Sequence, residues 1–330
     1  MSAPGAVDRW HNGIAPAAPA LSIAVPYKDF DVLPLARSLL SLAEACAGRV
    51  EIVFADDGSD DRGIGEHLRG LFSGSTVSCR LLSYARNIGR SAIRNRLAEE
   101  ARGDYLLYLD ADMLPDRPDF LARYLDHVDT GELDVVCGGR SYLHVHDWSA
   151  GQALYRHFSL RTECVGPQVR NSRPLWYVLT NNLCVRRSLQ LQRPFQESFR
   201  GWGFEDADWA LSLEGARVLH IDNPATHTGL LDERELLSKY DSSRDNFRLI
   251  SASSAEFRRF ALYRASRLLA FVPAPAAAMR IFARGLVLTR ALPMRLRYLG
   301  IHGYRAALYA GVLRENAWAR LARPRTSPHA

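Results

Sequence analysis

Cysteines, long apolar runs and, toward the C-terminus, acidic residues are scarce in this chain, and each scarcity argues against a class of protein. Five cysteines scattered over 330 residues show no metal-ligand spacing, which argues against a disulfide framework and favours a reducing compartment. No apolar run reaches the roughly 18 residues that a membrane-spanning helix needs. The hydrophobic content of 47% still supplies the core of one large domain with an appendage.

The two ends of the chain differ from its middle in composition. Residues 1–20 are rich in Ala, Pro and Gly and lack the basic start and apolar core of a signal peptide, so they are expected to form a disordered leader. Residues 256–330 hold 14 arginines against two acids, Glu256 and Glu315, whereas the preceding residues carry 28 basic and 34 acidic side chains. The positive charge is therefore concentrated in the C-terminal segment.

The basic C-terminal segment is also apolar, but arginines and prolines interrupt its apolar runs. Short basic amphipathic helices of this kind are typical of proteins at an anionic membrane surface, which would here be bound through residues 256–325. The alternative interpretation is that these helices pack on the rest of the protein with solvated arginines. The pattern matches no nucleic-acid-binding module, so no nucleic-acid partner is expected.

The middle of the chain alternates short apolar runs with helical patterns. Strands are expected at residues 21–26, 50–55, 80–83 and 105–109. Helices are expected at about residues 32–46 and through Arg94 and Asn95 to residue 101. Strands that alternate with helices predict βαβ units and a mainly parallel sheet, which is the α/β class. Because ligands of such folds bind at the carboxyl ends of the strands, the residues that follow each strand are expected to converge.

Two acidic clusters lie in this region. The first, Asp110-Ala111-Asp112, directly follows the strand that ends at Leu109, and the second is Glu205-Asp206 within Gly-Trp-Gly-Phe-Glu-Asp-Ala-Asp. Carboxylates so close together repel unless a cation or a proton separates them. A divalent cation that serves a diphosphate would resolve this repulsion, although the triplet alone fits a helix-capping loop equally well.

These motifs in their order resemble the nucleotide-sugar half of glycosyltransferase family 2, which has the GT-A fold. The resemblance rests on Val25-Pro26, Asp56-Asp57-Gly58-Ser59, Asn87-Ile88-Gly89 with Arg94-Asn95, and Asp110-Ala111-Asp112. The stretch 201–208 is similar to the acceptor-side motif of galactosyl- and N-acetylgalactosaminyltransferases. The resemblance covers residues from about Leu21 to Gly229 and implies a Rossmann-like central sheet flanked by helices.

The resemblance implies a metal site and a nucleotide site. Asp112 would bind the metal directly, His227 would be a further ligand, and Asp110 would contact the ribose, the metal or a metal-bound water. An imidazole ligand suits manganese better than it suits magnesium, so manganese is the expected cation and magnesium is the alternative. The implied nucleotide contacts are Asp57 with Asp56 beside it, Arg94 at the uracil or the diphosphate, and Pro26, which shapes the pocket through its fixed backbone.

For bond formation, a carboxylate must accept the proton of the acceptor hydroxyl. The motif implies Asp206 as this general base and Glu205 as a hydrogen-bonding partner of the sugar or the acceptor. Trp202, next to Gly203, would offer an apolar face to a sugar ring, and Asn181 would contact the donor sugar or the acceptor. The alternative is that the acidic residues merely occupy the first turn of a helix, where they favour the helix dipole.

The sequence thus predicts an inverting, metal-dependent glycosyltransferase with a catalytic domain at 21–235 and a basic helical segment at 236–330. The expected partners are a nucleotide-sugar donor, UDP-linked, and a glycan or lipid-linked acceptor, with a cytoplasmic location at the inner face of the cytoplasmic membrane. Two alternatives are a non-catalytic carbohydrate-binding relative and a sugar-phosphate nucleotidyltransferase. The latter should carry a glycine-rich phosphate loop after its first strand, but residues 25–29 contain no glycine.

Overall fold

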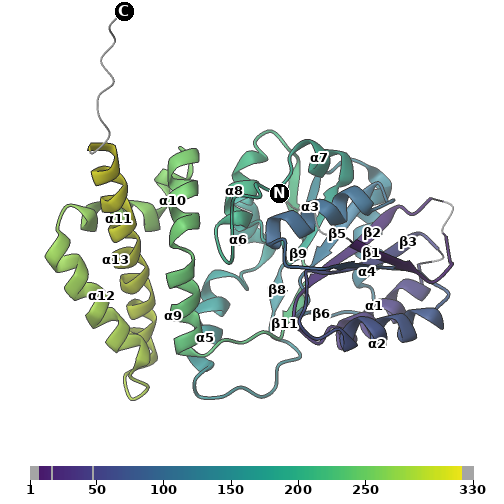
Figure 1. The fold of residues 1–330 in the computed structure, drawn as a ribbon, viewed down its shortest axis with the longest axis horizontal. Coiled ribbons are helices and arrows are strands. Elements are labelled where there is room, and N and C mark those ends of the chain that lie inside the picture. Colours follow the sequence, from purple (N-terminus) through teal and green to yellow (C-terminus); the bar gives the residue numbers. More distant parts are fainter. Residues whose placement is uncertain (1–6, 16–17, 47, 322–330) are drawn as a thin grey trace, which may run out of the picture. The chain divides into compact units, whose positions relative to one another are not determined.

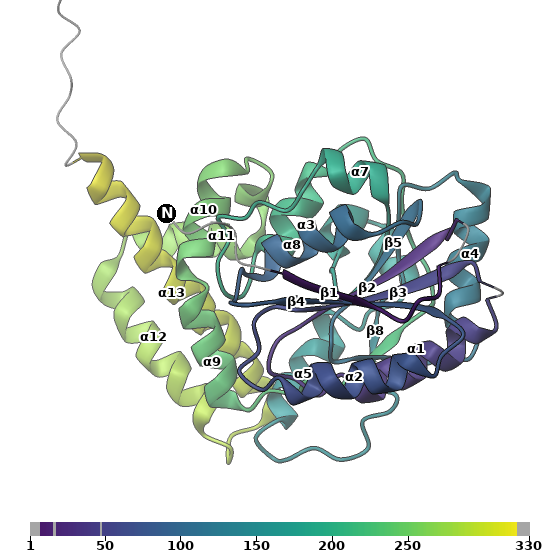
Figure 2. The ribbon, with the colours of Figure 1, turned by 45° about the vertical axis from the view of Figure 1, so that its right-hand side comes forward.

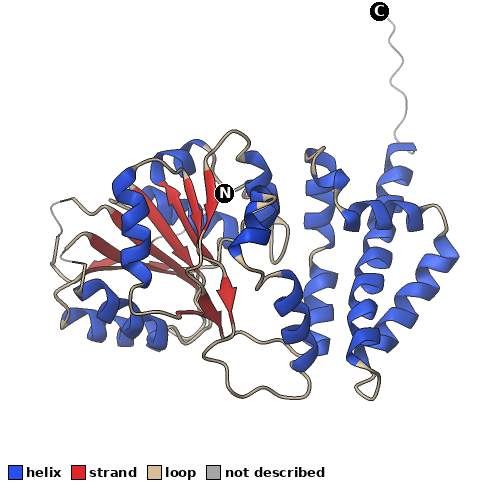
Figure 3. Ribbon diagram, turned by 180° about the vertical axis from the view of Figure 1, so that it is seen from behind, coloured by secondary structure: helices blue, strands red, loops and turns tan. Residues whose placement is uncertain are grey.

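The computed structural model describes residues 7–15, 18–46 and 48–321, with side chains described up to residue 315 (Figure 1). The chain divides into two compact units. The first consists of residues up to 147 together with 159–200 and 205–230, and the second consists of 148–158, 201–204 and the residues from 231 onward. All strands belong to the first unit, whereas the described regular elements of the second unit are helices (Figure 3).

The first unit is built on an eight-stranded sheet in the order β1-β4-β3-β2-β5-β9-β7-β10. The strands are β1 (Val7–His11), β2 (Leu21–Tyr27), β3 (Val50–Asp56), β4 (Ser78–Tyr84), β5 (Tyr105–Leu109), β7 (Val135–Cys137), β9 (Asn182–Arg186) and β10 (Val218–His220). The neighbours β4, β3, β2 and β5 are parallel, and β9 runs antiparallel to both β5 and β7. The expected strands β2 to β5 and the mainly parallel α/β sheet are confirmed. These strands were recognisable in the sequence because strands covered on both faces are continuous apolar runs.

Helices cover both faces of this sheet (Figure 2). On one face lie α1 (Leu33–Glu44) and α2 (Gly63–Ser73), and on the other α3 (Arg90–Glu100), α7 (Arg187–Gln192) and α8 (Glu205–Ser212). Two buried apolar clusters follow from this arrangement, one with Leu39 and Phe72 and one with Leu97 and Trp209. The remaining elements of the first unit include α4 (Phe120–Thr130), α6 (Pro167–Asn171) and the short helix η1 (Pro174–Tyr177).

A second, three-stranded sheet has the order β6-β11-β8, with β6 (Met113–Pro115), β11 (Ala225–His227) and β8 (Arg140–Ser141). The antiparallel register of β6 and β11 places Met113 opposite His227. A partly buried hydrogen-bond cluster joins the strands: Thr226 Oγ1 donates to Asp116 at 2.6 Å, and Ser141 Oγ donates to the other carboxylate oxygen at 2.5 Å. This small sheet brings the segment after Asp110 next to the segment around His227.

The expectation of a disordered leader is wrong for residues 7–11. These residues form β1, which pairs antiparallel with β4 from Val7 opposite Tyr84 to His11 opposite Arg80. Trp10 packs on the core, and Arg9 pairs with Glu100. The edge strand β1 is held by hydrogen bonds to β4, which lies far along the sequence. The composition of residues 7–11 alone therefore gave no sign that they form a strand. Residues 1–6 and 16–17 of the expected leader lie outside the described residues.

The second unit is helical. Its elements from residue 231 onward are α9 (Glu233–Ser242), α10 (Arg244–Ser253), η2 (Phe257–Arg259), α11 (Ala261–Ala270), α12 (Pro273–Leu288) and α13 (Met294–Leu321), while α5 (Ala153–Thr162) begins within its 148–158 segment. Helix α13 packs against α10, α11 and α12. The Tyr309 ring of α13 stacks on the Phe247 ring of α10, with 4.2 Å between the ring centroids. At 28 residues, α13 is longer than the short helices expected here. Within the described residues, no helix has the length and apolar character to cross a membrane.

Candidate active site

The two acidic clusters are joined at α3, where Arg94 pairs with the first cluster and Arg90 with both. Arg94 is buried, and its Nη2 lies 2.5 Å from Oδ1 of Asp110, which follows β5. Arg90, one turn earlier, lies 3.6 Å from the other oxygen of Asp110 and 3.3 Å from Oε1 of Glu205. Arg90 thus bridges the carboxylates of Asp110 and Glu205. Arg90 was not identified as a site residue from the sequence. Its spacing from Arg94 was a usable signal, because residues four apart on a helix lie on the same face.

Glu205 and Asp206 begin α8, and the two carboxylates have different surroundings. Glu205 is 7% exposed, and burial together with the nearby charge of Asp206 raises its pKa. Asp206 is less buried than Glu205. Its carboxylate accepts two hydrogen bonds from Thr180, one from the hydroxyl at 2.8 Å and one from the backbone N–H of Thr180 at 3.3 Å. Thr180 therefore fixes the orientation of the Asp206 carboxylate, a contact that the sequence did not predict.

Asp112 and His227 lie side by side at the small sheet. Nε2 of His227 is 2.9 Å from Oδ2 of Asp112, and the His227 ring packs edge-on against Tyr142. Burial alone would raise the pKa of Asp112, but the hydrogen bond and charge of His227, with nearby arginine charges, lower it to about 2. Asp112 is therefore ionised at neutral pH, as a metal ligand must be.

The Asp112 and His227 pair fits two ligands of one divalent cation. Two neighbouring ligands of an octahedral ion, each about 2.1 Å from it, lie about 3 Å apart. Gly229 backs onto the pair: an added Cβ would lie 2.2 Å from Oδ2 of Asp112 and 3.3 Å from Nε2 of His227. The site thus needs the space that this glycine leaves. The described residues contain no cluster of three such ligands, so the other positions would fall to water and a diphosphate.

Asp57 organises the loop before α3. Its carboxylate accepts hydrogen bonds from the backbone N–H groups of Ile88, at 2.6 Å, and Gly89, at 3.2 Å. Gly58 packs against this loop so closely that an added Cβ would lie 2.3 Å from the Arg86 backbone, and its φ of +71° also favours glycine. The Asp57 carboxylate therefore already has two backbone partners in the expected base pocket.

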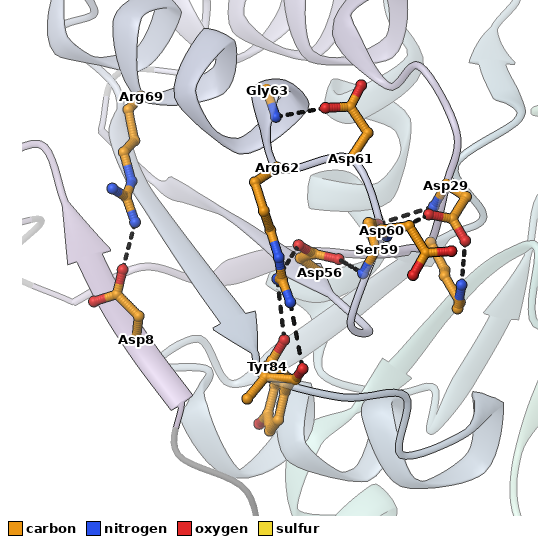
Figure 4. A network of polar contacts seen from close by, with 12 residues as sticks. Asp8, Asp29, Asp56, Ser59, Asp60, Asp61, Arg62, Gly63, Arg69 and Tyr84 are labelled. Carbon is orange, nitrogen blue, oxygen red and sulfur yellow. Dashed lines mark hydrogen bonds and ion pairs between the residues drawn. The ribbon is translucent and has the colours of Figure 1, made fainter.

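Asp56 and Arg62 form a neighbouring network, shown in Figure 4. The Asp56 carboxylate accepts from the Ser59 N–H at 2.8 Å and from Arg62 at 3.1 Å, while Arg62 also donates to the backbone carbonyls of Tyr84 and Ala85. Arg62 thus ties the end of β3 to the end of β4, beside a cavity of about 520 Å³. Asp56 therefore acts on the structure of the loop, and Arg62 is a further residue that the sequence did not reveal.

The structure places the other expected site residues as follows. Pro26 lies in β2 opposite Ala55, and the Asn181 carbonyl accepts from the Asp110 N–H at 3.3 Å, one residue from Thr180. Trp202 belongs to the second unit, where it packs edge-on against Tyr240 at 5.5 Å. The Gly203 carbonyl accepts from Asn246, also in the second unit, at 2.9 Å. The sugar-binding role of Trp202 and Gly203 stays a prediction.

Comparison with known proteins finds similarity to glycosyltransferases. Residues 22–177 match the family described as Glycosyl transferase family 2. The dolichyl-phosphate beta-glucosyltransferase of Dictyostelium discoideum is 29% identical over 124 residues, which is 35% of this chain and 38% of that enzyme. The uncharacterized glycosyltransferase YfnE of Bacillus subtilis (strain 168) is 24% identical over 67% of this chain and 70% of its own.

One solved structure supports the fold. The mannosyltransferase PcManGT from Pyrobaculum calidifontis, in complex with GDP-Man and Mn²⁺, superposes with a TM-score of 0.56 at 16% identity, over 93% of this chain and 90% of that one. The mainly parallel α/β sheet, with Asp110 and Asp112 directly after β5, has the GT-A fold. The similarity to glycosyltransferase family 2 covers residues 22–177, slightly less than half of the chain.

Proposed function

We propose that the protein is an inverting, metal-dependent glycosyltransferase that moves a sugar from a UDP-sugar to a hydroxyl of a glycan or lipid-linked acceptor. The observation that carries this proposal is the bridge from Asp110 through Arg90 to Glu205, which joins the two predicted acidic clusters. The name of the Dictyostelium relative contains dolichyl phosphate, which supports a lipid-linked acceptor. We also place the protein at the inner face of the cytoplasmic membrane, through residues 256–325.

Asp112 and His227 would hold the divalent cation, and their carboxylate and imidazole suit manganese, with magnesium as the alternative. The chemistry that such a cation supplies is neutralisation of the charge that builds on a departing diphosphate. Arg90 and Arg94 add fixed positive charge beside Asp110 and hold its carboxylate in place. Charges fixed in this way need no reorganisation during bond cleavage.

Asp206 would accept the proton of the acceptor hydroxyl, and its two hydrogen bonds from Thr180 hold the carboxylate in one orientation. A single displacement on the face opposite the leaving group inverts the sugar centre. Glu205 has a raised pKa and pairs with Arg90, an arrangement that suits a group that positions the sugar or the acceptor.

The test is release of the nucleoside diphosphate from a panel of UDP-, GDP- and other nucleotide sugars, with manganese and without acceptor. Slow hydrolysis of UDP-sugars that stops when a chelator is added would support the proposal. Binding of a nucleotide sugar without any release, with or without candidate acceptors, would instead favour a non-catalytic relative. Synthesis of a nucleotide sugar from a sugar phosphate and UTP would indicate the nucleotidyltransferase.

A further inference from the structure

The last three helices of the second unit expose large apolar side chains. Around the turn between α11 and α12, Leu268 is 71% exposed and Phe271 is 74% exposed, and on α12 Ile281 is 75% and Phe282 is 67% exposed. Val272, Leu296 and Leu299 are also exposed. Single exposed apolar residues are ordinary on soluble proteins, but repeated ones on neighbouring helices indicate an interaction surface. We call Leu268, Phe271, Val272, Ile281, Phe282, Leu296 and Leu299, together with the exposed arginines of α11–α13, the apolar–arginine surface.

The packing of α12 on α13 explains why these side chains point outward. Ala276, Ala283 and Val287 are the buried side chains of α12 and form one stripe of the helix. Gly300 of α13 allows close contact: an added Cβ there would lie 2.9 Å from Leu286 Cβ and 3.1 Å from the Ala283 carbonyl oxygen. With the small residues facing inward, helical periodicity directs Ile281 to the opposite side of α12. The exposure therefore follows from a well-packed helix pair.

The charge of the same helices has one sign. Residues 257–314 contain eleven arginines and no acidic residue. Glu233 of α9 pairs with two of them, since its oxygens lie 2.9 Å from Arg290 and 2.5 Å from Arg297, and its single negative charge offsets one of the two positive charges. Five others are exposed and, within the described part of the chain, pair with no carboxylate: Arg264, Arg267, Arg280, Arg284 and Arg295. The apolar–arginine surface therefore carries uncompensated positive charge among its apolar side chains.

We propose that the apolar–arginine surface docks on an anionic phospholipid leaflet. Phe271, Ile281 and Phe282 enter the boundary between headgroups and acyl chains, and the surrounding arginines contact lipid phosphates, which is the mode of binding of interfacial amphipathic helices. An acidic protein or a nucleic acid would engage the arginines but would gain little from exposed isoleucine and phenylalanine side chains. The inference deepens the proposed membrane location and rests on it, but it is independent of the proposed chemistry.

The experiment is co-sedimentation of the full chain with two kinds of vesicle, phosphatidylcholine alone and an equal mixture of phosphatidylcholine and phosphatidylglycerol. We expect the parent to bind the anionic vesicles, with weaker binding as salt increases. The combined change Phe271→Ser, Ile281→Ser and Phe282→Ser should reduce binding by roughly tenfold or more, because each lost side chain removes buried apolar area. Replacement of Arg264, Arg267, Arg280 and Arg284 by Gln should abolish the preference for anionic vesicles.

The matched control changes three exposed leucines from other parts of the chain, Leu143, Leu160 and Leu191, to Ser, and should bind as the parent does. If the triple serine variant is unfolded by circular dichroism, Ile281→Ser alone replaces it, with an expected severalfold loss. Equal vesicle binding by the parent and the serine variant would overturn the proposal. A second outcome would also overturn the proposal: the serine variant still binds vesicles, and heparin or tRNA displaces it from them. Such a result would indicate a site for polyanions in general. The assay contains no donor or acceptor, so release of UDP by the same variants tests the proposed function separately.

Discussion

Nε2 of His227 lies 2.9 Å from Oδ2 of Asp112, although the two residues come from distant parts of the sequence. The relationship is fixed by backbone pairing, because β6 and β11 are antiparallel with Met113 opposite His227. The Thr228 N–H also donates to the Asp112 carbonyl at 2.8 Å. The pair is therefore held by the small sheet and needs no ligand to bring it together, which is what a preorganised metal site requires.

Replacement of His227 by Ala should weaken manganese-dependent binding of UDP by at least about tenfold, because one of two protein ligands is lost. The measurement is calorimetric titration of UDP with manganese present and again with a chelator. His67→Ala is the control, since His67 is an exposed residue of α2. Equal UDP affinity of parent and His227→Ala, or parent affinity that ignores the chelator, would contradict the metal assignment.

Replacement of Gly229 by Ala should have a similar effect for a different reason. The new methyl group would lie 2.2 Å from Oδ2 of Asp112 and would occupy the space beside the two ligands. We expect at least about a tenfold loss of manganese-dependent UDP binding, because the added methyl group displaces the ligands from their coordinating positions. Gly70→Ala is the control, because an added Cβ there meets no atom within 4 Å. An unchanged manganese titration of Gly229→Ala would show that the site lies elsewhere.

Asp206→Asn should lower the rate of transfer by about 10² to 10⁴-fold, the usual contribution of a general base. Its affinity for UDP should stay within about twofold of the parent, because the amide can still accept from the Thr180 hydroxyl. The measurement pairs turnover with calorimetric UDP binding. Asp208→Asn, in the same first turn of α8, removes an equal charge and should keep most of the activity. Turnover of Asp206→Asn within a fewfold of the parent would refute the assignment.

The central strands and the catalytic motifs were predictable because each carries its signal locally. Strands β2 and β5 are buried on both faces and therefore are unbroken apolar runs, and Asp110 follows the second of them directly. The start of α8 at Glu205 was likewise visible as acids in a first helical turn. Local signals of this kind place a residue on the sheet edge without knowledge of its partners.

The rest of the site depends on pairings that the sequence does not display. Strands β6, β8 and β11 have only two or three residues each, too few for a periodic pattern, yet their register brings His227 to Asp112. Thr180 is an ordinary residue before β9 and acquires a role only when Asp206 arrives next to it. Edge strand β1 is similar, because its partner β4 lies far along the chain. Tertiary contacts, and not local preference, decide these elements.

The pH dependence of stability should reveal the buried, uncharged His220. Burial, reinforced by the charge of Arg170, lowers its pKa to about 4. Arg170 Nη1 lies 3.1 Å from the ring Nδ1, while Nε2 is 2.9 Å from the Pro174 carbonyl oxygen, so an added proton would face a guanidinium. Above the ordinary histidine pKa of about 6.5, neither the folded nor the unfolded chain is protonated at this ring.

As the pH falls from about 6.5 to about 4, the unfolded chain takes up a proton at this ring and the folded chain does not, so the free energy of unfolding decreases. At about 1.4 kcal/mol per pKa unit, His220 accounts for about 3 kcal/mol of this loss. His220→Asn should therefore lose stability less steeply with acid than the parent in urea titrations between these pH values. His67→Asn, at an exposed position, should follow the parent. Parallel curves for the parent and His220→Asn would mean that His220 is already charged in the folded protein.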